Sequence, residues 1–248
     1  MKKMKIALLG YGKMGAEMER VIAKKNHEIF IVVDSVDDWK EKGNRLGQAD
    51  VAIDFSSPDA VVRNINHCFH ANVPVVVGTT GWYENLEKVK TDCVNLNQAL
   101  FFAPNFSIGV NLFCDLNRHL ATLMSNWDEY EISIEETHHI HKHDAPSGTA
   151  IMLANDIIKH IGRKEKWVNE LSEHPRELGI KSIRMENEPG THIIKYESDI
   201  DNITIIHNAK TRRGFAIGAL MAAEWLHGKK GFFEMKDLLS SLKVTVSA

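Results

Sequence analysis

The sequence lacks the features that mark several large classes of protein. Its three cysteines, Cys68, Cys93 and Cys114, stand far apart and in no metal or redox spacing. They therefore exclude a disulfide framework and fit a reducing compartment. No apolar run approaches the length of a membrane span, and the run at residues 6–9, after a basic start, is too short for a signal peptide. We expect a cytoplasmic protein without a membrane partner.

Strong charge of either sign is also lacking. The formal net charge is -3 and no block of lysine or arginine occurs. The sequence therefore offers neither a basic surface for nucleic acid nor a polybasic patch for a membrane. Internal repeats and low-complexity segments are absent as well. A chain of 248 residues with 44% hydrophobic residues is long enough to bury a core as one large domain or two modest ones.

The first hundred residues alternate short apolar runs with stretches of helical periodicity. Expected strands cover residues 5–9, 29–33, 51–55, 73–77 and 99–103, and expected helices cover 13–25, 58–67 and 82–94. Continuous apolar strands separated by helices indicate a parallel sheet covered on both faces. The predicted fold class of this part is α/β, with a doubly wound parallel sheet.

The pattern changes after Pro104. Expected helices at 110–124 and 148–160 enclose a strand at 130–137, and further strands are expected at 180–185, 192–197 and 202–208. Turn residues separate the last three strands, so they predict a meander. The polar stretch 162–178 predicts a loop with a short helix. These elements indicate a second, α+β domain with a mixed sheet. A helix at 215–226 is apolar nearly all round and must be buried. We expect it to pack on the first domain.

A glycine-rich turn follows the first expected strand. Gly10-Tyr11-Gly12-Lys13-Met14-Gly15 is a GxGxxG pattern between a strand and a helix, where glycines allow the backbone to approach a pyrophosphate. Asp34 ends the second strand at the distance where a carboxylate meets the adenosine ribose. The pattern predicts dinucleotide binding, with a plain strand-to-helix turn as the alternative. Ser35 follows Asp34, so no adjacent cation receives a 2′-phosphate, and we expect NADH to be preferred over NADPH.

Two more loops follow the fourth and fifth expected strands. They are Gly78-Thr79-Thr80-Gly81 and Ala103-Pro104-Asn105-Phe106. In a doubly wound sheet the carboxyl ends of the strands face the ligand crevice. Position therefore favours contact with the nicotinamide over simple turn chemistry.

The segment from His138 to Thr149 carries the densest chemistry of the chain. Four histidines and Lys142 lie within six residues, and a Pro-Ser-Gly-Thr turn then opens an apolar helix. Histidine changes its charge nearest physiological pH, and a helix start favours a carboxylate or phosphate. We interpret the segment as a general acid beside an anion site. Two alternatives stay open: a metal site formed by His139, His141 and His143, and a strand with exposed histidines.

Assembled, these motifs resemble the 4-hydroxy-tetrahydrodipicolinate reductase (dihydrodipicolinate reductase) family of bacterial lysine and diaminopimelate synthesis. The resemblance covers the whole chain. It rests on the glycine-rich turn, Asp54-Phe55-Ser56, residues 78–81, residues 103–107 and, most specifically, residues 136–150. It implies a Rossmann-type dinucleotide-binding domain of residues 1–107, completed by C-terminal helices at 213–248. It further implies a substrate-binding and oligomerisation domain of residues 108–212 and a homotetramer.

The resemblance also implies roles for individual residues. The family reduces 4-hydroxy-tetrahydrodipicolinate, with loss of water, by hydride transfer from NAD(P)H, and needs no metal. His138 and Lys142 match its catalytic acid pair. His139, Gly148, Thr149 and Arg212 match residues that bind the dicarboxylate substrate. The cofactor contacts fall on Leu9, Gly10, Tyr11, Gly12, Lys13, Met14, Asp34, Gly78, Thr79, Thr80, Ala103, Pro104, Asn105 and Phe106.

The chain departs from the family pattern in places, and two other functions stay open. The phosphate loop is short and lacks an arginine, Asp34-Ser35 replaces an acidic-basic pair, and Ile140 replaces a frequent arginine. These departures argue against dual use of NADH and NADPH and leave the chemistry of the reaction intact. A metal-dependent hydrolase would carry stoichiometric zinc, and a dinucleotide-sensing module would bind NADH without turnover.

Overall fold

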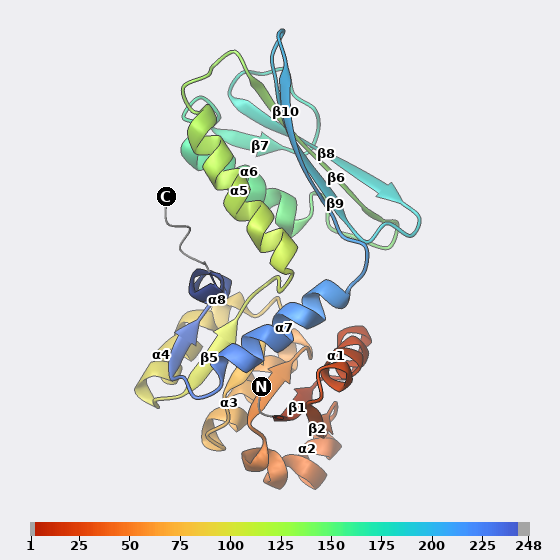
Figure 1. Ribbon diagram of the computed structural model, residues 1–248, viewed down its shortest axis with the longest axis vertical. Coiled ribbons are helices and arrows are strands. Elements are labelled where there is room, and N and C mark those ends of the chain that lie inside the picture. Colours follow the sequence, from red (N-terminus) through yellow and green to blue (C-terminus); the bar gives the residue numbers. More distant parts are fainter. Residues whose placement is uncertain (1–2, 243–248) are drawn as a thin grey trace. The chain divides into compact units, whose positions relative to one another are not determined.

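The computed structural model describes residues 3–242. The chain divides into two compact units, each with its own sheet (Figure 1). Unit 1 joins residues up to Ile108 with those from Arg212 onward, and unit 2 is residues 109–211. Within the described range, no helix combines the length and the apolar character needed to cross a membrane.

Unit 1 contains a six-stranded sheet in the order β11-β5-β4-β3-β1-β2, with every neighbouring pair parallel. The strands are β1 (Lys5–Leu9), β2 (Glu28–Val33), β3 (Val51–Asp54), β4 (Val75–Val77), β5 (Ala99–Phe102) and β11 (Gly231–Phe233). The five strands expected from apolar runs are confirmed, and β11 was not predicted. The chain leaves β1 toward β2 on one side and returns to β3 on the other. This reversal of strand order is where doubly wound sheets bind their ligands.

Helices cover both faces of this sheet. They are α1 (Lys13–Lys24), α2 (Val36–Lys42), α3 (Pro58–His70), α4 (Leu86–Asn95), α7 (Arg213–Leu226) and α8 (Met235–Leu242), with 3-10 turns at Gly43–Gln48 and Tyr83–Asn85. Side chains alternate along β1, so Ile6 and Leu8 pack with α1, α7 and α8, whereas Ala7 and Leu9 pack with α3 and α4. The predicted doubly wound α/β class is therefore confirmed.

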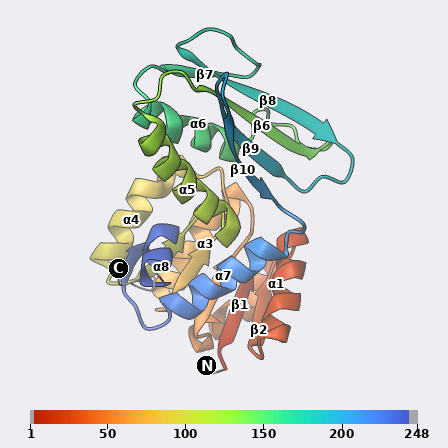
Figure 2. The same ribbon diagram turned by 45° about the horizontal axis from the view of Figure 1, so that its top comes forward.

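The small residues of α7 let it pack closely inside unit 1. Ala216, Ala219 and Ala223 are fully buried in the same core as α1, and α7 lies beside α1 in both views (Figure 2). Gly218 meets the carbonyl of Phe106 so closely that a Cβ atom there would lie 1.8 Å from the oxygen. A residue larger than glycine at this position would force the helix away.

Unit 2 contains a mixed five-stranded sheet in the order β10-β9-β6-β8-β7. Its elements are α5 (Ile108–Met124), β6 (Glu131–His139), α6 (Gly148–His160), β7 (Lys166–Val168), β8 (Glu177–Met185), β9 (Thr191–Glu197) and β10 (Asn202–Asn208). Helices α5 and α6 share one apolar core with β6, β8 and β9. The central strand, β6, pairs in parallel with β8 and in antiparallel with β9. The predicted α+β domain with a mixed sheet is confirmed.

Two details of the prediction for unit 2 are wrong. The strands β8, β9 and β10 are not a meander, because β6 lies between β8 and β9. The turn residues at Glu188-Pro189-Gly190 correctly signal that the chain reverses, but a turn does not specify which strand fills the place beside it. The polar stretch 162–178 is mostly loop, as predicted, but it contains the short strand β7 rather than a short helix. Pairing with β8 overrides its weak local pattern.

We expect Gly218→Ala to lower the free energy of unfolding by about 1–3 kcal/mol or more, because the added methyl group collides with a backbone carbonyl that cannot turn away. Chemical denaturation followed by circular dichroism measures this. The matched control is Gly214→Ala in the same helix, where a Cβ atom meets only the Ser107 hydroxyl at 3.9 Å. Equal stability of the two variants would contradict the close-packing interpretation of α7.

Candidate active site

Three neighbouring strands of unit 2 place a set of polar side chains on one face of the sheet. Glu136 and His138 are two residues apart on β6, so they point to the same side. The strand register puts Arg184 of β8 opposite His138 and His192 of β9 opposite Glu136. Residues opposite one another in a ladder have adjacent side chains. Pairing alone therefore gathers two histidines, a carboxylate and a guanidinium.

The carboxylate of Glu136 joins His138 to Arg184. One of its oxygens pairs with Nδ1 of His138, and the other accepts a hydrogen bond from Arg184 at 2.9 Å. Glu136 is fully buried and His138 is 9% exposed. With Nδ1 occupied by the carboxylate, Nε2 is the nitrogen of His138 that can exchange a proton with a ligand. Gly190 lies close to this nitrogen. A Cβ atom added to Gly190 would be 2.9 Å from Nε2 of His138.

The charged partners keep Glu136 ionised. Burial raises the pKa of this carboxyl group, but hydrogen bonds from His138, Ser182 and Arg184 outweigh the burial and lower the pKa to about 2. A carboxylate fixed in this way holds the orientation of the His138 ring through Nδ1.

His192 connects this cluster to the start of α6. Its ring lies edge-on to that of His138, with centroids 5.1 Å apart, and its Nε2 lies 3.1 Å from the hydroxyl of Ser147. Burial lowers the pKa of His192 to about 3, and the positive charges of His138 and Lys142 contribute to the lowering. His192 thus lies between His138 and the helix start, and its lowered pKa favours the neutral form of the ring.

The start of α6 presents backbone amides beside the cluster. Ser147 is the N-cap residue, and its hydroxyl accepts a hydrogen bond from the amide of Ala150 at 3.2 Å. Gly148 and Thr149 are the first two residues of the helix. Amide groups in the first turn of a helix have no partner within the helix and attract anions. The predicted pair, Gly148 and Thr149, therefore lies in a helical turn whose backbone amides can attract an anion.

Lys142 lies just beyond the end of β6, on the loop that leads to α6. Its ammonium group donates to both carboxylate oxygens of Asp144 at 2.7 Å. Burial raises the pKa of Asp144, whereas the hydrogen bond and charge of Lys142 lower it, and the net pKa falls. Arg184 donates to the backbone carbonyls of Lys142 and Asp144 at 3.4 and 2.6 Å. The predicted acid pair is thereby linked through one arginine.

In the described part of the chain, His139, His141 and His143 are not gathered with the spacing of metal ligands. Because β6 ends at His139, the alternation does not continue to His141 and His143. Among residues 3–242, the one cluster of three side chains with metal-ligand spacing is Glu136, His138 and His192, and there Arg184 already occupies the carboxylate. His139 lies half-buried near His141, with ring centroids 6.2 Å apart.

The glycine-rich turn of unit 1 has the shape that a pyrophosphate needs. Gly10 has a φ of +90° and approaches Phe55 so closely that a Cβ atom would lie 2.4 Å from the Phe55 oxygen. A Cβ atom on Gly15 would lie 2.6 Å from the Gly10 oxygen, whereas at Gly12 nothing lies within 4 Å. The N-cap of α1 is Gly12, which has no side chain to cover the first amides. These residues fit a dinucleotide.

Asp34 closes the turn from the neighbouring strand. Its carboxylate accepts a hydrogen bond from the amide of Tyr11 at 2.6 Å, and its side chain is exposed at the end of β2. The capping box of α2 follows at once, with Ser35 and Asp38 bonded to each other. Asp34 therefore lies beside the turn, as its spacing predicted.

A second buried carboxylate organises the loops at the ends of β3 and β4. Asp54 is fully buried and accepts hydrogen bonds from Thr79 at 2.6 Å, Asn64 at 2.8 Å, and the amide and hydroxyl of Ser56. Burial raises its pKa, and these bonds oppose the rise. The Thr79 hydroxyl is engaged inside the protein, so Thr79 has its backbone to offer a ligand.

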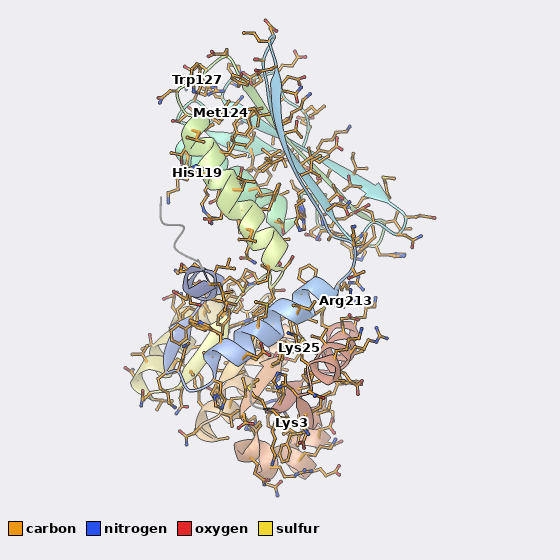
Figure 3. All side chains as sticks on the ribbon, in the orientation of Figure 1. Lys3, Lys25, His119, Met124, Trp127 and Arg213 are labelled. Atoms are coloured by element: carbon orange, nitrogen blue, oxygen red, sulfur yellow. The ribbon has the colours of Figure 1, made fainter. Side chains whose placement is uncertain are left out.

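The remaining predicted residues lie at sheet ends or helix starts. Leu9 ends β1, Lys13 and Met14 begin α1, and Gly78 follows β4. Leu9, Ala103 and Phe106 are buried, whereas Thr80 and Pro104 are exposed. The side chain of Asn105 accepts a hydrogen bond from the amide of Ser107. Arg212, the exposed N-cap residue of α7, belongs to unit 1 and precedes Arg213 (Figure 3). The cofactor set therefore follows the carboxyl edge of one sheet.

Sequence reasoning missed four residues of the unit 2 cluster. Glu136 had a signal, since it stands two residues before His138 on an expected strand. Ser147 was part of the quoted motif but had no assigned role. Arg184 and His192 gave no local signal, because only the pairing of β6 with two distant strands brings them in.

Comparisons with known proteins agree over both units. The family model described as dihydrodipicolinate reductase, N-terminus, matches residues 4–106, and the one described as dihydrodipicolinate reductase, C-terminus, matches residues 109–239. A 4-hydroxy-tetrahydrodipicolinate reductase of Christiangramia forsetii is 46% identical over 240 residues, 96% of this chain and 99% of that protein. One from Neisseria meningitidis serogroup A is 34% identical, covering 78% of this chain and 74% of that protein.

Solved structures share the fold. The dipicolinate-bound dihydrodipicolinate reductase from Paenisporosarcina sp. TG-14 superimposes with a TM-score of 0.70 at 22% identity, covering 94% of this chain and 98% of that one. An amine dehydrogenase from Mycobacterium smegmatis gives a TM-score of 0.57 at 7% identity, covering 92% and 94%. The arrangement of elements is thus shared well beyond recognisable sequence similarity.

The depressed pKa of His192 predicts that unit 2 loses stability in acid. Between pH 3 and 6.5 the unfolded chain binds a proton at this ring that the folded chain does not bind. The contribution of His192 to the free energy of unfolding is therefore complete above pH 6.5. It declines by about 1.4 kcal/mol per pH unit as the pH falls toward 3. Urea unfolding of His192→Asn across this range should show a shallower dependence than the unaltered protein. Substitution of the exposed His119 on α5 (Figure 3) is the control, and identical slopes for His192→Asn and the unaltered protein would contradict the prediction.

Proposed function

We propose that His138 and Lys142 are the catalytic acid pair of this chain, which belongs to the dihydrodipicolinate reductase family and reduces 4-hydroxy-tetrahydrodipicolinate in lysine and diaminopimelate biosynthesis. The observation that carries the assignment is the match of both family models, together covering residues 4–106 and 109–239. The 46% identical relative, which bears the name of this activity, agrees with it. The buried pair of His138 with Glu136 supports the role given to His138.

The substrate chemistry requires a proton donor near the ring. Loss of the hydroxyl group as water leaves a cyclic dicarboxylate with a conjugated imine. A bound nicotinamide supplies the hydride, and negative charge then moves onto carbon and nitrogen of the substrate. The Nε2 proton of His138 and the ammonium group of Lys142 stabilise this charge, and one of them returns a proton. Glu136 pairs with Nδ1 of His138 and so leaves Nε2 as the nitrogen that can meet the substrate.

The two carboxylates of the substrate require separate anchors. The amides of Gly148 and Thr149 at the start of α6 suit one of them. His139, and Arg212 at the start of α7, complete the proposed substrate set. The short distance in sequence between Lys142 and the helix start keeps the proton donor and the anchor together.

A pyridine nucleotide is the proposed cofactor, with NADH preferred over NADPH. Unit 1 would hold it through the turn at 9–14, Asp34, the backbone at 78–80 and the loop at 103–106. The carboxylate of Asp34 repels a 2′-phosphate, and Ser35 offers no positive charge to offset it. A homotetramer in the cytoplasm completes the proposal and rests on family resemblance.

The test of the reaction is absorbance at 340 nm with purified protein, either nucleotide and substrate made in situ. A synthase acting on pyruvate and aspartate semialdehyde supplies the substrate. We expect oxidation that depends on the synthase product and is faster with NADH. A faster rate with NADPH would keep the reaction and overturn the cofactor preference. Binding of NADH without any oxidation would overturn the reaction.

His138→Gln and Lys142→Ala should each lower kcat by about 10²–10⁴-fold, because each removes one positioned proton donor. The KM for NADH should change little, since the proposed cofactor residues lie in unit 1. Steady-state kinetics measure both constants, and circular dichroism checks that each variant is folded. His143→Gln, at an exposed position of the same segment, is the matched control. Unchanged turnover in either active-site variant would remove that residue from the mechanism.

Asp34→Asn should raise the ratio of kcat/KM for NADPH to that for NADH by about 10-fold or more. It removes a charge whose repulsion of a phosphate about 4 Å away is about 1–4 kcal/mol, while its amide oxygen still accepts the Tyr11 amide. Asp37→Asn, in the first turn of α2, is the control. If the ratio stays constant in Asp34→Asn, discrimination lies elsewhere in the chain.

A further inference from the structure

Arg184 contacts both the strand that carries His138 and the loop that carries Lys142. Its guanidinium, carried by β8, donates to the Glu136 carboxylate at 2.9 Å. The other oxygen of that carboxylate pairs with His138. The same side chain donates to the carbonyl of Asp144 at 2.6 Å and to that of Lys142 at 3.4 Å. One side chain therefore bridges the strand that carries His138 and the loop that carries Lys142.

The backbone around His138 is held by more hydrogen bonds than the backbone around Lys142. His138 lies within β6, which is paired on both sides in the sheet. Lys142 lies beyond the end of that strand, where its amide bonds the carbonyl of His139 at 3.0 Å. The hydrogen bonds from Arg184 to two carbonyls of this loop fix its distance from the strand. A planar guanidinium holds several acceptors in a fixed geometry, which a lysine ammonium does not do.

The charge of Arg184 matters as much as its shape. Glu136 is fully buried, and a buried carboxylate with a single cationic partner is poorly stabilised when that partner gives up its proton. In the proposed function His138 is one of the two groups that can give a proton to the substrate. Arg184 keeps its charge throughout, so Glu136 remains an anion in both states of His138.

We propose that Arg184 is a positioning residue that sets the geometry of both proton donors, Lys142 through the loop carbonyls and His138 through Glu136. The inference rests on the proposed function and deepens it. Arg184 touches no reacting atom, and its effect passes through the two residues it holds.

The test compares Arg184→Ala and Arg184→Lys with Arg176→Ala. Arg176 is exposed in the same unit and pairs with Glu165 at 2.7 Å, so its loss should leave turnover unchanged. We expect Arg184→Ala to lower kcat by about 10- to 100-fold, the effect of misplaced catalytic groups. The KM for NADH should stay within about 2-fold of its original value. Arg184→Lys should be intermediate, because the charge returns but the fork does not.

Rescue separates positioning from general damage. Guanidinium ion, added well below denaturing concentrations, should restore part of the kcat of Arg184→Ala with saturation and leave Arg176→Ala unaffected. A double-mutant cycle with Glu136→Gln should show that the combined loss of kcat is smaller than the product of the single losses, since both act on His138.

Several outcomes would overturn the inference. Turnover at the original level in Arg184→Ala would do so. So would a reduced kcat that guanidinium does not change, if the loss of kcat in the double variant with Glu136→Gln also equals the product of the two single losses. If Arg184→Ala does not fold, Arg184→Lys decides: full kcat overturns the proposal, and a reduced kcat with intact NADH binding supports it. Absence of turnover in the unaltered protein would instead contradict the proposed function itself.

Discussion

Moving a carboxylate out of water costs several kcal/mol unless charged donors replace the water, and unit 2 meets this constraint at Glu136. His138 and Arg184 supply the donors, one on each oxygen. The other polar groups of the cluster contact His138 or are held by Arg184. His192 fits against His138 as a neutral ring and reaches Ser147, and Arg184 reaches the loop of Lys142. The same contacts that make the burial tolerable also aim Nε2 of His138 away from the carboxylate.

In unit 1, the close approach of backbone segments sets the shape of the glycine-rich turn. At Gly10 and Gly15 the chain passes so close to other backbone atoms that a side chain has no room. The same closeness brings the start of α1 up to the end of β1. Asp54 then holds the loop after β4 through the Thr79 hydroxyl. A rigid edge of backbone amides results, and such an edge suits phosphate and amide groups of a nucleotide.

Much of this was readable from sequence where the signal is local. Alternating apolar runs and helical periodicity predicted the parallel sheet of unit 1, and GxGxxG with Asp34 predicted the turn that β1, α1 and β2 form. Pairing between distant strands has no local signal. The insertion of β6 between β8 and β9 was therefore missed, and with it the place of Arg184 and His192 beside His138. The strand β11 was missed for the same reason, since it is short and gains its place by pairing with β5. Local pattern thus located the reactive residues, and non-local pairing determined which groups surround them.

The division of unit 1 into two stretches of chain has a consequence for biosynthesis. Its core needs α7, and its sheet needs β11, yet both follow the whole of unit 2 in the chain. On the ribosome, where domains generally fold as they emerge, the five strands from β1 to β5 leave the exit tunnel long before the helix that covers one of their faces. Unit 2 is continuous and has all of its own core before α7 is made. During translation, unit 1 is therefore the last unit to become complete, and the part of its apolar sheet face that α7 covers stays uncovered until then.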